Sequence, residues 1–556
     1  MSRTPGGAGR AGRLGRVVSG VGVAALLGGV TALGLRLPAA APADDVRTVV
    51  PVPPTATTLV CPGPVVLAAD DAASDAAFDP APVETRTTLR AVSLPPSPDE
   101  GEPSTGTSSD ASTETEPAPD APAAEVSPLG GGAPLVTLDD RSVGGLDAVP
   151  GPTLVRAEPA GDVAVTAGAA SASITTQGDL RGLAAASCRA PAASTWLVGG
   201  STEIGSSALL VVANPGRTPA EVSLDLWGPT GALDPAGAST FLVAPGEQRG
   251  VLLEGVAAEQ RRVAVHVSAA GGVVSAHVQD SRLNGFTPAG TDLVTAGTEP
   301  ATRQVLTGVV VPASTLEEPD TALVRVLAPG RDRAVVRLTV LGPDGPVSLP
   351  GAERLDLGPG EVTDVSLAGL PAGAYTVVVD ADTAVVAGAM LTREGNPVEL
   401  GDVPTLERAW AAAVPVGETG VVAVPGGVVG TVVAAAVPPV PDDVLEGGAG
   451  STGAPATGVL RVLGTDGTVL SSQDVDVPAG RTARFDLAAL AAGVEVAAVE
   501  LVPSGTDDPG RAALAWSVLA TSGSGAQELV SVLSPVPAPD AQPDVVVGAA
   551  DRLGLR

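Results

Sequence analysis

The chain has two histidines, and imidazole is the side chain best suited to acid–base chemistry near neutral pH and to zinc binding. His266 and His277 occupy two β-branched runs that are joined by Gly271 and Gly272, with Asp280 shortly after. If these runs form a hairpin, the two rings lie across from each other and, with Asp280, form a metal site. Ordinary positions on a strand face or rim are the favoured interpretation, because a later copy of this segment carries no histidine there. We therefore predict no metal and no cofactor.

Two cysteines offer the next candidate chemistry. Cys61 and Cys188 are the only cysteines of the chain, and an even number in an exported protein favours a disulfide over a reactive thiol. We predict a Cys61–Cys188 disulfide, which would restrain the unfolded chain by roughly 4 to 5 kcal/mol in the entropy model. A catalytic cysteine with a histidine partner is the alternative, but no cysteine-protease signature surrounds either residue.

The remaining catalytic inventory is sparse. The sequence contains no lysine, which excludes a Walker lysine and a Schiff-base lysine, and it has no G-x-S-x-G or H-E-x-x-H motif. Aspartate and glutamate allow a glycosidase carboxylate pair in principle, but aromatic residues make up 2% of the chain and leave little ring surface for a sugar. Structural roles are favoured over ligand contact for all four tryptophans: Trp196, Trp227, Trp410 and Trp516. We predict that the protein is not an enzyme.

Charge and length exclude further classes. With 62 acidic and 31 basic residues the net charge is −31, which repels phosphate backbones, so no nucleic-acid partner is expected. A chain of 556 residues is too long for one core, and its few aromatic residues predict cores built from Val, Leu and Ala.

The first residues predict export. Residues 1–16 carry four arginines and no acid, and residues 17–35 are uncharged and long enough to span a membrane as a helix. Ala41-Pro42-Ala43 then offers a cleavage site. We predict that residues 1–43 are a signal peptide, with an uncleaved anchor in the cytoplasmic membrane as the alternative. Either way the rest of the chain is extracytoplasmic, secreted or anchored to the membrane.

Short β-branched runs in residues 44–94 and 135–187 predict strands, which form a small N-terminal β module or an added sheet. Residues 95–134 between them are rich in Pro, Ser, Thr and acidic residues. Such a composition buries too little apolar surface to offset the entropy of ordering. We predict a disordered acidic insertion.

An internal repeat organises the remainder. The segment ALLVVANPGRTPAEVSLDLWGPTG at 208–231 returns 114 residues later as ALVRVLAPGRDRAVVRLTVLGPDG, with half of the positions identical. Alternating apolar and polar residues predict a strand with one buried face, and the following Gly-Pro-x-Gly predicts a turn. What recurs forms the fold. Any activity must therefore depend on residues that differ, such as Asn214 and Trp227, which the second copy replaces with Ala328 and Leu341.

A third copy is more divergent and contains VLGTDG at 462–467. The strand lengths and the Gly/Pro turns predict an all-β protein of tandem immunoglobulin-like β-sandwiches. A propeller is the alternative, but its blades repeat at about 40 to 50 residues, which is less than half the spacing found here. The predicted modules are residues 188–298, 299–404 and 405–536, followed by a tail at 537–556.

Short motifs carry a resemblance. The run from Cys188 through Trp196-Leu197-Val198-Gly199-Gly200 to Asn214-Pro215-Gly216, together with Cys61-Pro62-Gly63-Pro64, resembles an actinobacterial family of exported proteins catalogued as domain of unknown function 5719. The resemblance implies an exported cell-envelope protein and transfers no catalytic residue.

The favoured hypothesis is a non-catalytic, extracytoplasmic protein with a scaffolding or binding role, whose partners are envelope proteins or glycans. The alternative is an envelope-associated carbohydrate-binding protein or hydrolase, which predicts that tryptophans cluster at the surface with Asp or Glu.

Overall fold

The computed structural model describes residues 47–50, 53–67, 85–94, 123–139, 141–161, 163–235, 239–318, 321–397, 403–440, 453–506, 508, 510–539 and 545–548. The chain divides into two compact units. In the unit made of Met1–Pro53 and Gln542–Arg556, β1 (Arg47–Val50) pairs antiparallel with β36 (Val545–Gly548). The other unit, Pro54–Ala541, contains all other described strands. The predicted signal or anchor segment, 1–43, lies outside the described residues. No helix in the described part is long and apolar enough to cross a membrane.

The module at residues 194–294, which we call the second because the N-terminal strands form the first, shows how the repeat folds. Alternate residues of β12 are buried, so this strand turns one face to a core. That core is shared by two antiparallel sheets, one of order β10–β16–β12–β13 with β14 added to β12, the other of order β15–β11–β17–β18. The strands are β10 (Ser194–Val198), β11 (Ser206–Ala213), β12 (Ala220–Gly228), β13 (Gly231–Leu233), β14 (Thr240–Val243), β15 (Gln248–Leu252), β16 (Ala264–Ala270), β17 (Ser275–Asn284) and β18 (Thr287–Val294), with η2 (Leu253–Gly255) after β15.

The third module repeats this plan at the offset seen in the sequence. Its sheets are β19–β25–β21–β22, with β23 on β21, and β24–β20–β25–β26, because the long strand β25 bends and contributes to both. The strands are β19 (Ala301–Val311), β20 (Ala322–Leu327), β21 (Ala334–Gly342), β22 (Gly345–Val347), β23 (Leu355–Leu357), β24 (Val362–Ser366), β25 (Gly373–Pro397) and β26 (Pro404–Ala412). The all-β sandwich prediction is confirmed.

The fourth module also has two sheets, of order β30–β29–β32–β27–β35 and β31–β28–β33–β34. A single short helix, α2 (Leu487–Leu490), is capped by the Asp486 carboxylate, which accepts from the N–H groups of Ala488 and Ala489. The strands are β27 (Gly420–Ala423), β28 (Val429–Val437), β29 (Ala456–Gly464), β30 (Val469–Val477), β31 (Thr482–Asp486), β32 (Val496–Ser504), β33 (Ala513–Ser522), β34 (Leu529–Leu533) and β35 (Val536–Pro537), with η3 (Gly525–Gln527) before β34.

The N-terminal strands form a complete sandwich of the same plan, which extends the predicted small module. Sheet β2–β7–β4–β5 corresponds to β10–β16–β12–β13, and sheet β6–β3–β8–β9 corresponds to β15–β11–β17–β18. The prediction that all of 95–134 is disordered is wrong at its end, because Ala124 and Val126 of β4 are fully buried, and residues 95–122 lie outside the described part. The strands are β2 (Thr57–Cys61), β3 (Thr85–Leu94), β4 (Ala124–Pro128), β5 (Val136–Leu138), β6 (Ser142–Leu146), β7 (Thr153–Ala157), β8 (Thr166–Thr175) and β9 (Gly182–Ser187).

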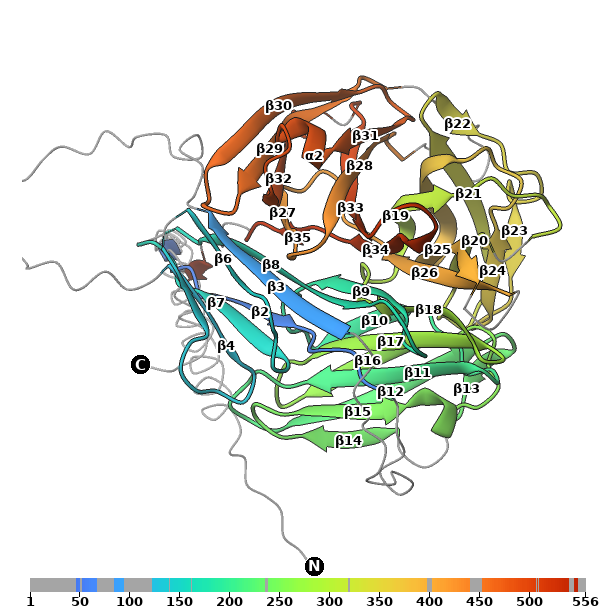
Figure 1. Cartoon of the computed structure of the whole chain (residues 1–556), viewed down its shortest axis with the longest axis horizontal. Coiled ribbons are helices and arrows are strands. Elements are labelled where there is room, and N and C mark those ends of the chain that lie inside the picture. Colours follow the sequence, from blue (N-terminus) through green and yellow to red (C-terminus); the bar gives the residue numbers. More distant parts are fainter. Residues whose placement is uncertain are drawn as a thin grey trace, which may run out of the picture. The chain divides into compact units, whose positions relative to one another are not determined.

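The four sandwiches close into a ring around four edge strands, one from each module: β9, β18, β26 and β34 (Figure 1). Shared apolar clusters join the N-terminal module to the fourth, the fourth to the third, the third to the second and the second to the N-terminal. At the centre the Asp292 carboxylate accepts from the Trp410 N–H at 2.7 Å and lies 2.8 Å from the Ser531 hydroxyl, which is 3.1 Å from the Ala185 carbonyl. These contacts tie all four modules together.

Candidate functional site

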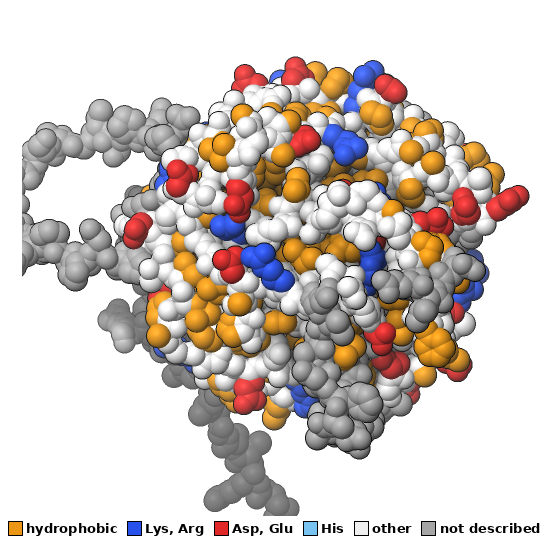
Figure 2. Space-filling model, in the orientation of Figure 1, with side chains coloured by type: hydrophobic (Ala, Val, Ile, Leu, Met, Phe, Trp, Pro, Cys, Tyr) orange, Lys and Arg blue, Asp and Glu red, His pale blue; other side chains and the backbone are white. Residues whose placement is uncertain are grey.

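A cleft between the second and third modules is lined by many charged side chains. Its volume is about 370 Å³. Five guanidinium groups and two carboxylates line it, so its wall carries a local excess of positive charge in a protein whose net charge is −31. We call it the arginine cleft, and its charged residues are Arg261, Arg262, Arg282, Arg325, Arg408, Glu203 and Asp364. Elsewhere, side chains of both signs are scattered among uncharged ones on the face shown in Figure 2.

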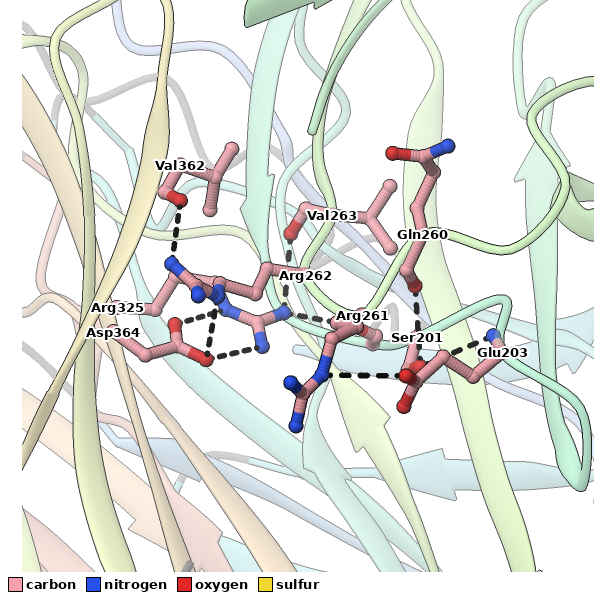
Figure 3. A network of polar contacts seen from close by, with 10 residues as sticks. Ser201, Glu203, Gln260, Arg261, Arg262, Val263, Arg325, Val362 and Asp364 are labelled. Atoms are coloured by element: carbon pink, nitrogen blue, oxygen red, sulfur yellow. Dashed lines mark hydrogen bonds and ion pairs between the residues drawn. The ribbon is translucent and has the colours of Figure 1, made fainter. Parts of the chain in front are cut away.

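Arg325 on β20 forms the inner wall of the arginine cleft. Its Nε and Nη2 donate to the two oxygens of Asp364 on β24 at 2.8 and 3.0 Å, and its Nη1 donates to the Gly200 carbonyl at 2.6 Å (Figure 3). Its guanidinium also lies 5.1 Å from the centre of the Trp410 ring. Arg325 is 3% exposed and its donors are occupied, so it fixes the two modules together and leaves ligand contact to its neighbours.

The outer arginines keep unused donors. Arg261 pairs with Glu203 through Nε alone, at 3.2 Å, and Arg262 donates to the Val362 carbonyl at 3.1 Å while its Nε lies 3.7 Å from Asp364 (Figure 3). Arg282 is partly exposed on β17, and its guanidinium has no hydrogen-bond or ion-pair partner among the described residues. The mouth of the cleft therefore presents N–H groups that can donate hydrogen bonds to a bound anion.

The floor of the arginine cleft is both apolar and polar. Leu323, Met390 and Leu406 contribute apolar surface. Beneath them the buried Asp280 accepts through Oδ2 from Arg408 Nη1 and from Trp410 Nε1, both at 2.9 Å. A ligand that suits this lining combines an anionic group with an apolar body, because arginines surround the mouth and aliphatic groups the base.

A second cavity lies on the outer face of sheet β10–β16–β12. Trp196 stacks on Trp227 with ring centres 5.2 Å apart and on His266 at 4.4 Å, and Asp225 is directly across from His266 in the strand register. Beside them is an open cavity of about 480 Å³, completed by Pro329, Gly330, Asp332, Thr383 and Ala384 of the third module. We call it the aromatic hollow.

Ser194, His266 and Asp225 form a row beside the aromatic hollow. The Ser194 hydroxyl is 3.1 Å from His266 Nε2, and His266 Nδ1 is 3.2 Å from Asp225 Oδ2. This order is that of a serine-hydrolase triad. However, the Glu299 carboxylate lies 3.3 Å from the same hydroxyl, where its charge would repel the oxyanion that acyl transfer forms. The row also holds the His266 ring against Trp196.

The structure separates the two histidines. The hairpin that would bring them together does not form, because β16 and β17 belong to opposite sheets of the sandwich. His266 pairs with Trp196 and Asp225, while His277 is opposite Val211. The chain crosses between the sheets at Gly271, which adopts φ +78. Among the described residues no group of three or more His, Cys, Asp or Glu is placed to hold a metal ion.

The other predicted residues have clear places. Cys61 and Cys188 form the predicted disulfide, which joins the two sheets of the N-terminal module, and both are fully buried. The Asn214 side chain stabilises the turn after β11, where its amide group donates hydrogen bonds to the Thr218 and Val243 carbonyls. Of the two differing residues named above, Asn214 therefore serves the fold and Trp227 lines a cavity.

Sequence reasoning missed the arginine cleft. Its cations come from four separated segments, namely the loop before β16, the end of β17, β20 and β26. One signal was present: the second repeat copy carries Arg325 where the first carries Val211, in an otherwise apolar strand.

Comparisons with known proteins place the chain in a family without assigning it an activity. No curated protein matches it. A crystal structure of a Thermotoga maritima protein is similar with 17% sequence identity and a TM-score of 0.16, over 20% of this chain and 95% of that one. The model of a family of unknown function, DUF5719, matches residues 143–457, which is more than half of the chain. The chain therefore belongs to the DUF5719 family.

Proposed function

We propose that this protein is a non-catalytic, extracytoplasmic cell-envelope protein that binds an anionic ligand in the arginine cleft. The observation that carries the proposal is the gathering of five guanidinium groups around a cavity of about 370 Å³ in a chain of net charge −31. The ligand class is a small molecule with a carboxylate or phosphate group on an apolar body. The disulfide supports an oxidising compartment outside the cytoplasm.

Isothermal titration of the full chain with inorganic phosphate, citrate and benzoate tests the binding site. We expect saturable binding of at least one anion, weakened at least about tenfold by R261Q/R282Q, because two charge-assisted contacts are lost. The matched control is R86Q/R156Q, which removes the same charge from exposed pairs of the N-terminal module. Absence of saturable binding, or equal weakening by both double variants, contradicts the proposal.

A fluorophosphonate probe tests the non-catalytic part. It labels serines that a histidine activates, and Ser194 is the described serine that lies in a Ser–His–Asp row. We expect no labelling of the native protein beyond that of S194A. Labelling that S194A abolishes would assign a hydrolase activity instead.

A further inference from the structure

We propose that the aromatic hollow is a second binding site, which takes a neutral pyranose unit of a glycan. The aromatic hollow shares no lining residue with the arginine cleft, so binding at each site can be tested independently. The chain has four tryptophans in 556 residues, yet two of them stack together beside this one cavity.

The third module does not share the aromatic character of this stack. In the strand register of the third module, the positions of Trp196, Trp227 and His266 are taken by Val305, Leu341 and Val378. These replacements occupy the same strand plan, β19, β21 and β25. The third module buries these aliphatic side chains at its junction with the fourth. The second module instead presents rings beside an open cavity at the equivalent junction, where they pack in part against the third module.

The arrangement presents a graded platform. Trp196 is 8% exposed and forms the back of the stack, whereas Trp227 and His266 are partly exposed and border the cavity. The indole of Trp227 offers an apolar face next to open space, and one face of a pyranose ring consists of C–H groups that pack on such a surface.

Polar groups line the cavity beside this platform. Asp225 and Asp332 are exposed carboxylates on opposite walls, and Thr383 adds a hydroxyl. A carboxylate accepts from a hydroxyl, and a hydroxyl both donates and accepts. No arginine lines the hollow, which disfavours an anionic ligand.

Charge also disfavours a cationic ligand. Asp225 already contacts the His266 ring at 3.2 Å. Asp332 lies between Arg331 and Arg333 in the sequence, and all three are exposed on one loop, so two cations neighbour this carboxylate along the chain. Aromatic surface and hydrogen-bond acceptors together fit an uncharged pyranose. A volume of about 480 Å³ is ample for one or two sugar rings.

Intrinsic tryptophan fluorescence of the full chain tests the proposal. The probes are the methyl pyranosides of glucose, galactose and mannose and their β-linked disaccharides, each titrated to about ten times the millimolar Kd expected of a weak site. We expect a saturable change with at least one probe. We expect W227L and D332N each to weaken it at least about fivefold, and R261Q/R282Q to leave it unchanged.

The controls keep the outcome interpretable. W227L introduces the residue that the third module carries at this position, so its Tm should stay within a few degrees of the native value. F286L makes a matched aromatic-to-leucine change at a fully exposed position outside the hollow and should not alter binding. No saturable response to any sugar, a response that W227L retains, or a response to tetramethylammonium in place of sugars overturns the proposal. If W227L does not fold, the D332N variant tests the proposal, and a sugar response that D332N leaves unchanged overturns it.

Discussion

Arg325 and Asp364 face each other on neighbouring strands, at the register position that Val211 and Gly250 occupy in the preceding module. The two strand pairs are otherwise equivalent. An apolar pair has thus become a bidentate ion pair at one place in the ring, and the guanidinium also reaches across to the Gly200 carbonyl of the second module. The pair serves the junction between modules, because neither sandwich needs it for its own core.

This relationship predicts an asymmetry between single and double variants. D364A leaves Arg325 buried without a carboxylate, and we expect a loss of about 3 to 5 kcal/mol, the cost of an unpaired buried charge. R325V/D364G restores the pair that the second module uses and should lose less. Differential scanning calorimetry of both variants measures the order. A double variant that is less stable than D364A would show that the Gly200 and Trp410 contacts of Arg325 outweigh the unpaired charge.

The sequence predicted the fold where one repeat could be compared with another. Alternation in β12 and the Gly-Pro-x-Gly turn identified the sandwich strands, because one buried face imposes period two. The N-terminal sandwich is not recognisable as a copy of the repeat from its sequence. Its strands β3 (Thr85–Leu94) and β4 (Ala124–Pro128) flank a long acidic segment, whereas the corresponding strands of the second and third modules are joined by a short turn. Topology exposes this copy, since it depends on pairing rather than on residue identity.

The candidate sites were harder to predict because they lie between modules. Trp227 was recognised as a residue that differs between copies, but the other wall of its hollow includes Asp332 and Thr383, more than 100 residues further on. The sequence suggests that His266 and His277 lie together, but the crossover between sheets separates them. Packing between modules decides the first case and sheet assignment the second, and periodicity alone determines neither.

We predict that Asp292, at the centre of the ring, is protonated. Burial raises the pKa of Asp292 well above its ordinary value, against the hydrogen bonds from Trp410 and Ser531 that lower it. A protonated Oδ1 can donate to the Ser531 hydroxyl, which then donates its single proton to the Ala185 carbonyl. Every group in the chain of hydrogen bonds is satisfied without a buried charge.

Variants at this chain of hydrogen bonds separate charge from hydrogen bonding. Because an amide can donate to Ser531 and accept from the Trp410 N–H, we expect D292N to be as stable as the native protein at neutral pH. S531A should cost about 1 to 3 kcal/mol, since it leaves buried partners unsatisfied. Thermal unfolding monitored by circular dichroism measures both. A strong loss in D292N together with a neutral S531A would mean that Asp292 is ionised and bound as an anion.

Glu407 predicts a pH dependence of stability. Burial raises its pKa from 4.5 to about 8, although its ion pair with Arg181 lowers it. The folded protein then binds more protons than the unfolded chain between these values. The contribution of Glu407 to the free energy of unfolding is therefore fully present below pH 4.5 and is lost as pH rises through about 8.

The neutral variant E407Q should remove this dependence. We expect its Tm relative to that of the native protein to increase as pH is raised from 4.5 to 8, because only the native side chain must lose a proton in a buried place. Calorimetry across this range in buffers of equal ionic strength provides the measurement, and E353Q, at an exposed position, is the control. A Tm difference that does not change with pH would show that Glu407 is ionised throughout, as the partner of Arg181.

The disulfide links stability to export. Cys61 and Cys188 are separated by 127 positions in the sequence, so the disulfide restrains a long loop of the unfolded chain. Both cysteines are fully buried, so the bond is shielded from reductants. We expect C61A/C188A to be less stable by roughly 4 to 5 kcal/mol in the entropy model. Maleimide labelling under denaturing conditions provides the compartment test: the full chain made in its host should carry no free thiol, whereas residues 44–556 made in a reducing cytoplasm should carry two. Two free thiols in the full chain would contradict an extracytoplasmic location, because a buried bond formed outside the cytoplasm would persist.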